Sequence, residues 1–416
     1  MKHKHWWFIF LNLGFSSFSL AQQNLDSLDA VQNKISAEKL LITGYRHFDR
    51  GQQKFWNLGP LLQNFVQYNS VEGFVFSENF DFNKGLNKQR FLNTGLAARY
   101  GLASGRFLAK GHVNLLLNRA KDLSIRLDAG QYVFQYNAQE PIGVINNTFT
   151  TLFSGKNLMK LYEKSFVQLG IKTEIFKGIT PNISLAFEER FPLINQSDFS
   201  FKHKEKRIFT ANDPQNPNNF EPAFVAHQAL IFDFGLKISP EKWLSNPDKS
   251  YPVFSIQYKM ARRDLDFDKM VFKISQQQST PLGTTKMATS FATFLNTNNI
   301  QFIDYQHFMS NLSAFGSNNM EAFMMIGSYQ FSTKSHAFQL QTEQHFEGYF
   351  LRNSPFFKKL NWHEVVSAKI LYTPEQGIYS EFGLGLENIF QFYKCDFITS
   401  IHQGKICPAF RFGLTL

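Results

Sequence analysis

Residues 406–416, the last eleven of the chain, alternate strictly in character. Every second residue is apolar, apart from one proline, and the residues between them are small or polar. A period of two is the period of a β-strand, so the segment predicts one apolar and one polar face. Soluble proteins usually protect a strand edge of this kind, because it pairs with other chains. The pattern favours the closing strand of an outer-membrane barrel over an ordinary sandwich strand. Its lipid face would carry Phe410, Phe412, Leu414 and Leu416.

The same alternation recurs from about residue 73 onward. Apolar residues alternate with charged or amide residues in segments of roughly ten, separated by Gly, Asn, Pro and Ser. Val167 and Leu169, for example, flank Gln168, and the pattern also assigns a strand to Phe323, Met325, Tyr329 and Phe331. The sequence therefore predicts an all-β fold. We expect a single antiparallel transmembrane β-barrel of about sixteen strands (roughly 14–18), with short periplasmic turns and long extracellular loops.

Composition narrows the class of protein further. The 416 residues include 48 Phe, and aromatic residues make up 16% of the chain, which suits strands with one face in lipid. Beyond the N-terminus no apolar run approaches the ~20 residues that a spanning helix needs. The formal net charge is +10, but Lys and Arg are spread out and accompany no nucleic-acid-binding motif. We therefore expect no nucleic-acid partner.

The N-terminus has the pattern of an export signal. Basic residues precede an apolar core at residues 6–15, and small residues end at Ala21, so residues 1–21 are predicted to be a signal peptide. An interfacial anchor helix is the alternative. We expect residues 22–45 to be a periplasmic lead-in and residues 46–416 to form the barrel. The predicted location is the cell outer membrane.

Two segments interrupt the alternation. Residues 135–165 contain Pro141 and a polar stretch, and then Leu158, Leu161 and Tyr162 at helical spacing, which could form a short helix in a loop. Residues 195–224 are rich in proline and asparagine, which excludes a regular strand. Long loops in such barrels are usually extracellular and functional.

Polar residues in the predicted strands are candidates for a network inside the barrel. We expect Arg190, Asp304, His307, His345 and Glu347 to belong to it. Histidine and carboxylate side chains could also bind a metal or act as an acid–base pair, but a hydrogen-bonded network is the more common role. His363 and Glu364 resemble the start of a zinc motif, yet Ser367 stands where the second histidine belongs. We predict no catalytic residues, no metal site and no cofactor.

The two cysteines, Cys395 and Cys407, fall on the last two predicted strands. If the hairpin between them is centred near Ile401, they face each other and could form a structural disulfide. A register shift of one residue removes that option.

Several short strings occur in a characteristic order. They are YNSVEGF at 68–74, RYG at 99–101, NLMKLYEK at 157–164, RFPL at 190–193, DYQHF at 304–308 followed by Asn311, HFEG at 345–348, and GLENIF at 385–390. Through them, residues 45–416 resemble an uncharacterised outer-membrane β-barrel family of Bacteroidetes, usually found after a carboxypeptidase-regulatory-like domain. That domain is expected to be missing here. The resemblance implies the fold and the location, and no established activity.

These observations lead to a functional expectation. We expect an outer-membrane β-barrel with a role in transport, export or cell-envelope assembly and no catalytic chemistry. A barrel-embedded hydrolase acting on lipid or envelope material and a surface adhesion or binding scaffold are the alternatives. The expected partners are outer-membrane lipid and, through the C-terminal strand, the barrel assembly machinery; the ligand is left open.

Overall fold

The computed structural model describes residues 44–49, 54–59, 67–202, 209–243, 250–310, 319–391 and 393–414. The expected signal peptide, nearly all of the lead-in and Leu416 lie outside these ranges. Within them the chain is all-β, with 18 strands in one sheet. None of the described helices has the length and hydropathy that a membrane-spanning helix needs.

The strands follow the chain from one margin of the sheet to the other. Three short strands come first: β1 (Tyr45–Asp49), β2 (Lys54–Leu58) and β3 (Gln67–Asn69). Fifteen longer strands follow: β4 (Gly73–Gly85), β5 (Phe91–Gly101), β6 (Arg106–Asn118), β7 (Leu123–Gln135), β8 (Leu161–Lys172), β9 (Ile179–Pro192), β10 (His227–Ile238), β11 (Val253–Arg263), β12 (Asp266–Thr280), β13 (Gly283–Asn299), β14 (His336–His345), β15 (His363–Thr373), β16 (Gly377–Ile389), β17 (Tyr393–His402) and β18 (Lys405–Leu414).

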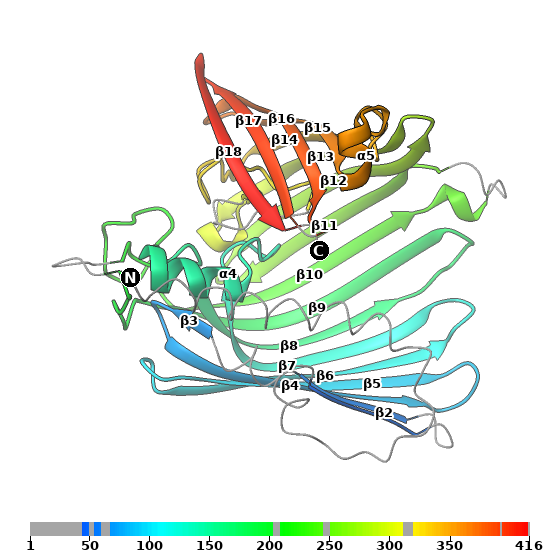
Figure 1. Ribbon diagram of the computed structural model, residues 1–416. Coiled ribbons are helices and arrows are strands. Elements are labelled where there is room, and N and C mark those ends of the chain that lie inside the picture. The colour runs from blue at the N-terminus through cyan, green and yellow to red at the C-terminus, as the bar shows by residue number, and fades with distance from the viewer. Residues whose placement is uncertain are drawn as a thin grey trace.

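The sheet is an antiparallel meander. From β4 to β18 each strand pairs with the next, while β2 and β3 both pair with β4 and β1 pairs with β2. Figure 1 shows these strands succeeding one another around a strongly curved sheet, from β2 and β4 to β18. The strand number lies at the upper limit of the expected range. Closure of the sheet into a ring stays a prediction; the residue-by-residue pairing that the structure gives for β18 is with β17.

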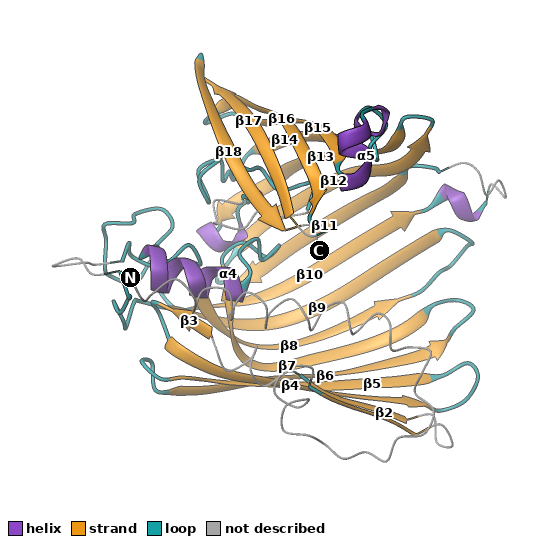
Figure 2. Cartoon of the chain, in the orientation of Figure 1, coloured by secondary structure: helices purple, strands orange, loops and turns teal. Residues whose placement is uncertain are grey.

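The connections differ between the two ends of the strands. At one end, which we call the loop end, three long connections lie at residues 136–160, 193–226 and 300–335. The opposite end has mostly short turns, but two connections there, at residues 239–252 and 346–362, are longer than expected. The helical elements, coloured in Figure 2, lie in these connections. They are α4 (Val144–Phe149), η1 (Thr150–Ser154), η2 (Pro240–Lys242), η3 (Phe302–Asp304), η4 (Leu351–Asn353) and α5 (Pro355–Leu360).

The two faces of the sheet differ in polarity, as the alternation predicts. On β8 and β9 the apolar residues Val167, Leu169, Ile171, Ile183, Leu185 and Phe187 are exposed, and the residues between them, such as Gln168, Ser184 and Glu188, lie on the other face. We call the exposed apolar face the apolar belt. Its members include Phe76, Phe80, Leu96, Val113, Leu127, Val167, Leu169, Ile171, Ile183, Leu185, Phe187, Leu230, Phe254, Phe272, Phe291, Phe338, Val366, Phe382, Leu384, Phe397, Phe410 and Phe412.

The last strand has the same two faces. Phe410 and Phe412 are 69% and 67% exposed, whereas Arg411 is partly buried opposite Asp396. The side chain of Leu414 lies outside the described set. The last strand therefore carries its large apolar side chains on the outer surface of the sheet and its arginine on the inner one.

The register of the last hairpin corrects the cysteine hypothesis. The turn lies at Gln403 and Gly404, both of which have positive φ, so Ile401 pairs with Ile406. A two-residue turn of this kind requires positive φ at both positions, which Gly404 supplies readily. Cys395 therefore stands opposite Phe412, Cys407 stands opposite Ser400, and both thiols are free.

One element prediction was wrong, and another was confirmed in kind but not in position. Phe323, Met325, Tyr329 and Phe331 belong to the 300–335 connection and not to a strand. The helix in the 136–160 connection covers residues 144–154, earlier than the spacing of Leu158, Leu161 and Tyr162 suggested, and β8 already begins at Leu161. In the first case apolar residues alternate because they pack inside the protein, which produces the same pattern as a lipid-facing strand.

Candidate functional site

Residues 319–335, which we call the inner loop, lie against the inner face of the sheet. Phe323 and Phe331 are fully buried there with Ile326, and they pack with Phe308 against wall residues. These wall residues are Ala292, Ala337, Leu371 and Tyr379, on β13 to β16. The small alanines leave room for the rings. The loop therefore fills part of the interior and does not extend into solvent.

Two buried charges on the wall hold the inner loop by its main chain. Glu381 and Lys369 are directly paired residues of β16 and β15, and they are only 2% and 4% exposed. The Glu381 carboxylate accepts hydrogen bonds from the backbone N–H groups of Met324 and Met325, at 2.8 and 2.7 Å. The Lys369 ammonium donates to the carbonyl oxygen of Ala322 at 2.9 Å. Buried charges persist only when they are hydrogen-bonded or paired, and these contacts meet that need.

A chain of ion pairs joins β8 and β9 to the start of the same connection. Lys164 contacts Glu188 at 2.6 Å, and Glu188 contacts Arg190 at 2.9 Å. Arg190 in turn donates to Asp304 at 2.7 Å, and both side chains are buried. Lys269 of β12 donates to the carbonyl oxygen of Tyr305 at 3.1 Å. The 300–335 connection is therefore fastened to the inner wall at two places, residues 304–305 and residues 322–325.

His307 lies in the same connection among aromatic rings. Its Nδ1 is 2.7 Å from the Ser332 hydroxyl, and its ring centroid is 5.0 Å from that of Phe302 and 5.2 Å from that of Tyr329. Burial, reinforced by the positive charge of Lys269, lowers the pKa of His307 to about 3. The imidazole is therefore neutral at physiological pH.

An aromatic cluster joins the three long connections at the loop end. Tyr136 lies at its centre, with ring centroids 6.2 Å from Phe224 and 6.4 Å from Tyr329. These residues come from the first, second and third long connection. Lys160 adds a further link, because its ammonium donates to the Thr210 hydroxyl at 3.0 Å, and burial lowers the pKa of Lys160 to about 8. The three connections form one packed unit over the loop end of the sheet.

The expected polar network divides into two groups. Arg190 and Asp304 are in direct contact near the loop end, and His307 lies in the same connection. His345 and Glu347 lie at the opposite end of β14, where His345 is 3.1 Å from Glu387 and Glu347 accepts a hydrogen bond from Thr284 at 2.8 Å. Within the described residues, no cluster of three or more His, Cys, Asp or Glu side chains could hold a metal ion.

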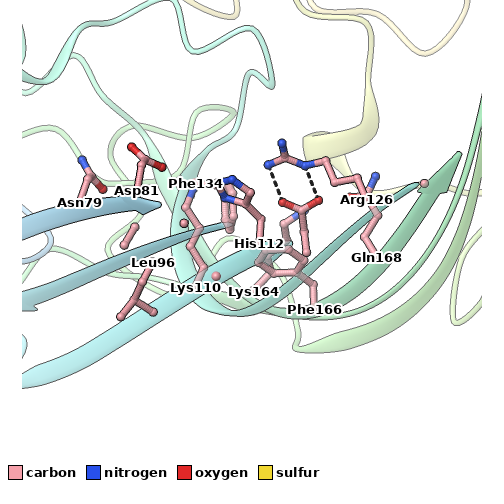
Figure 3. Close-up of a pocket in the computed structure, with 15 residues that line it drawn as sticks. Asn79, Asp81, Leu96, Lys110, His112, Arg126, Phe134, Lys164, Phe166 and Gln168 are labelled. Atoms are coloured by element: carbon pink, nitrogen blue, oxygen red, sulfur yellow. Dashed lines mark hydrogen bonds and ion pairs between the residues drawn. The ribbon is translucent and has the colours of Figure 1, made fainter. Parts of the chain in front are cut away.

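A cavity of about 630 Å³ remains on the inner wall between β4 and β8. Figure 3 shows Lys110, His112, Arg126 and Lys164 at its surface, together with Phe134 and Phe166. The Lys110 ammonium lies 5.0 Å from the centroid of the Phe134 ring, and that of Lys164 lies 4.6 Å from it. Arg126 forms a two-bond pair with Asp128, at 2.7 and 2.8 Å. The cavity therefore has a charged, hydrogen-bonding surface suited to hydrated polar solutes.

Close packing shapes the wall of this cavity. A Cβ atom at Gly95 would lie 2.3 Å from the His112 ring and 2.7 Å from the Asp81 carboxylate. Glycine is therefore required at this position so that the neighbouring strands can place these two side chains side by side. His112 is held further by Asn93, at 2.8 Å from its Nε2.

Sequence reasoning missed the residues that anchor the inner loop. Glu381 is visible in the sequence as a polar residue of an alternating strand, but nothing local distinguishes it from other inward carboxylates. Its partners lie more than fifty residues earlier, in a segment interpreted as a strand. Lys110 and Lys164 likewise meet Phe134 only because three strands bring them together.

Comparisons with known proteins bear on the fold and the family. A family model described as "Family of unknown function (DUF5686) C-terminal domain" matches residues 38–386. Among curated proteins, none matches the chain significantly.

Several solved structures are similar to the chain, and three of them are described here. BamA from Haemophilus ducreyi lacking POTRA domains 1–3 is 11% identical, with 87% of this chain and 69% of that chain covered, at a TM-score of 0.47. CdiB from Acinetobacter baumannii is 11% identical, with 84% and 57% covered, at a TM-score of 0.43. OccK5 (OpdH) from Pseudomonas aeruginosa is 8% identical, with 88% and 92% covered, at a TM-score of 0.33.

Proposed function

We propose that this chain, which belongs to the DUF5686 C-terminal domain family of unknown function, is an outer-membrane β-barrel that acts in transport, export or cell-envelope assembly. The observation that carries the proposal is the segregation of the two faces of the sheet. Apolar side chains cover the exposed face from β4 to β18, while ion pairs line the inner face. An exposed apolar surface of this extent is unfavourable in water and favourable in hydrocarbon.

In this proposal the sheet closes into a ring, because an open sheet edge in lipid would leave backbone groups without hydrogen bonds. The loop end faces the cell exterior, since long loops in such barrels are extracellular, and β18 ends at the periplasmic side. The C-terminal strand, with Phe410 and Phe412 outward, is the segment that the barrel assembly machinery would engage.

The interior supports a gated route rather than a permanent open pore. The inner loop occupies the lumen beside β13 to β16, while the polar cavity lies beside β4 to β8. A polar solute could occupy the cavity, and its passage would require displacement of the three packed connections. The proposal includes no catalytic step.

Two measurements on the full-length protein test the proposal. The folded protein should fractionate with the outer membrane and migrate faster on a gel before boiling than after it. In planar bilayers the wild type should show low or intermittent conductance, because the loops obstruct the lumen. Recovery of the protein in the soluble fraction without a heat-dependent shift would exclude the membrane barrel. Labelling of one serine by a hydrolase probe would favour the enzyme alternative instead.

A further inference from the structure

In the helical segment 144–154 of the first long connection, polar residues face inward and apolar residues face outward. This is the reverse of the arrangement on a helix at the surface of a water-soluble protein. The inward side of the segment is mainly polar: Thr151 is 0% exposed and Asn147 is 1% exposed, and Thr148 and Thr150 are also buried, together with the apolar Leu152. Its outward side is apolar, with Phe153 47% exposed and Ile145, Phe149 and Val144 exposed to a similar degree. Ile145, Phe149 and Phe153, spaced four residues apart, form what we call the apolar stripe.

Asn147, Thr148 and Thr151 of the buried polar side form hydrogen bonds. The side-chain oxygen Oδ1 of Asn147 accepts from the backbone N–H groups of Leu158 and Met159, at 3.1 and 3.0 Å. The Thr148 hydroxyl accepts from the backbone N–H of Tyr68 in β3 at 2.9 Å. These bonds determine how the segment is rotated about its axis. The outward direction of the apolar stripe is therefore imposed by the fold and is not an accident of a loose loop.

A series of aromatic rings connects the apolar stripe to the outer face of the sheet. The Phe153 ring centroid lies 5.3 Å from that of Phe201, which lies 5.3 Å from that of Phe199. Phe199 is in turn 6.2 Å from Phe74, which shares a face of β4 with the belt residue Phe76. Figure 1 shows α4 beside β3, at the margin of the sheet. The stripe is therefore continuous with the apolar belt.

We propose that the apolar stripe lies in the lipid surface of the membrane, at the boundary between headgroups and acyl chains next to β3 and β4. Continuity with the apolar belt selects lipid as the occupant. Aromatic side chains and amphipathic helices are both favoured at this boundary. This inference rests on the proposed membrane barrel. In it, the apolar stripe anchors the first long connection to the bilayer from the side of the barrel.

The test uses nitroxide labels on the full-length protein in phospholipid vesicles. Cys395 and Cys407 are replaced by serine, and single cysteines are introduced as I145C, F149C or F153C. L169C, in the apolar belt, is the lipid control, and K156C, exposed just after the helix, is the water control. Two collision rates are measured for each label. One is with oxygen, which concentrates in lipid, and the other is with a nickel chelate, which stays in water. Each variant must retain its heat-dependent gel shift.

The three stripe positions should resemble L169C, with high oxygen and low nickel accessibility, whereas K156C should show the reverse. Water-like accessibility at all three stripe positions, with L169C in lipid, would overturn the inference and leave the barrel intact. Water-like accessibility at L169C as well would overturn the barrel itself. Shielding of the stripe from both reagents would show that protein covers it, either a partner or a second copy, and would also overturn the inference.

Discussion

At the scale of single residues, charged side chains of the inner wall bind the backbone of the inner loop. Glu381 and Lys369 direct their charges at the backbone of the inner loop, and the surrounding rings exclude water. Hydrogen bonds to charged groups contribute about 1.5–3 kcal/mol each in such surroundings. These two residues should therefore control whether the inner loop stays in place.

Replacing Glu381 with Gln should loosen the inner loop. The amide is a weaker acceptor than the carboxylate, and we expect a loss of about 1.5–3 kcal/mol of docking free energy. The measurement is hydrogen exchange of the backbone amides of residues 322–326, which should accelerate roughly ten- to hundredfold. Glu387→Gln is the matched control, because Glu387 contacts His345 and not the loop. Unchanged exchange in Glu381→Gln would contradict the anchoring role.

Acidic pH should release the 300–335 connection through His307. The folded pKa is about 3, and a released histidine has a pKa of about 6.5, so the released state binds more protons between these values. Stability of the docked state is fully present above pH 6.5 and falls by about 1.4 kcal/mol per unit below it. At pH 4.5 the loss is about 3 kcal/mol. Bilayer conductance should therefore rise between pH 7 and pH 4.5.

His307→Asn separates this effect from other titrations. Asparagine retains a polar group near Ser332 but cannot be protonated in this range. The rise in conductance at acidic pH should be smaller in this variant than in the wild type, because the histidine no longer contributes to it. An equal rise in both proteins would assign the effect to carboxylates and contradict the prediction for His307.

At the scale of elements, the strands were predictable because each of them meets two different environments. Val167, Leu169 and Ile171 alternate with Gln168 and Gly170, and the structure places the two sets on opposite faces. The inner loop shows where this reasoning fails. Phe323, Met325 and Phe331 alternate for another reason, packing against Leu371 and Tyr379, and the sequence cannot tell buried protein from lipid as the apolar environment.

A charge in the apolar belt should be far more costly than one on the inner face. Leu169→Arg should destabilise the protein in lipid vesicles by about 2–4 kcal/mol, because the side chain must bring its charge into hydrocarbon. Gln168→Arg, one residue earlier and beside Asp128 in the cavity wall, is the matched control and should cost much less. The measurement is urea unfolding in vesicles. Equal losses in the two variants would argue against lipid contact at β8.

At the scale of the whole molecule, packed connections cover the loop end, and mostly shorter connections join the strands at the opposite end. Replacing residues 300–335 with a short Gly/Ser turn between β13 and β14 should remove the inner loop and its part of the obstruction. We expect a stable, larger conductance than that of the wild type. A similar replacement of residues 346–362, at the opposite end, is the control and should leave conductance nearly unchanged. A silent variant that keeps the heat-dependent gel shift would show that other segments close the lumen.

The sequence was informative about the architecture and much less so about the interior. The composition and the alternation predicted an all-β sheet with roughly the right number of strands. Of the expected polar network, Arg190 and Asp304 do meet, but His345 lies at the other end of the sheet. Such contacts depend on which strands are neighbours and on how a loop folds back, and neither is encoded in local spacing.

The anchors of the inner loop have a consequence for how this protein can diverge. In the inner loop, Glu381 and Lys369 contact peptide groups and not side chains, so Ala322, Met324 and Met325 can be exchanged for residues of similar size without loss of either attachment. Proline at 324 or 325 is the exception, since it removes a donor. In homologues, the sequence of residues 322–325 should therefore vary widely, whereas Glu381 and Lys369 should either both be retained or be substituted together.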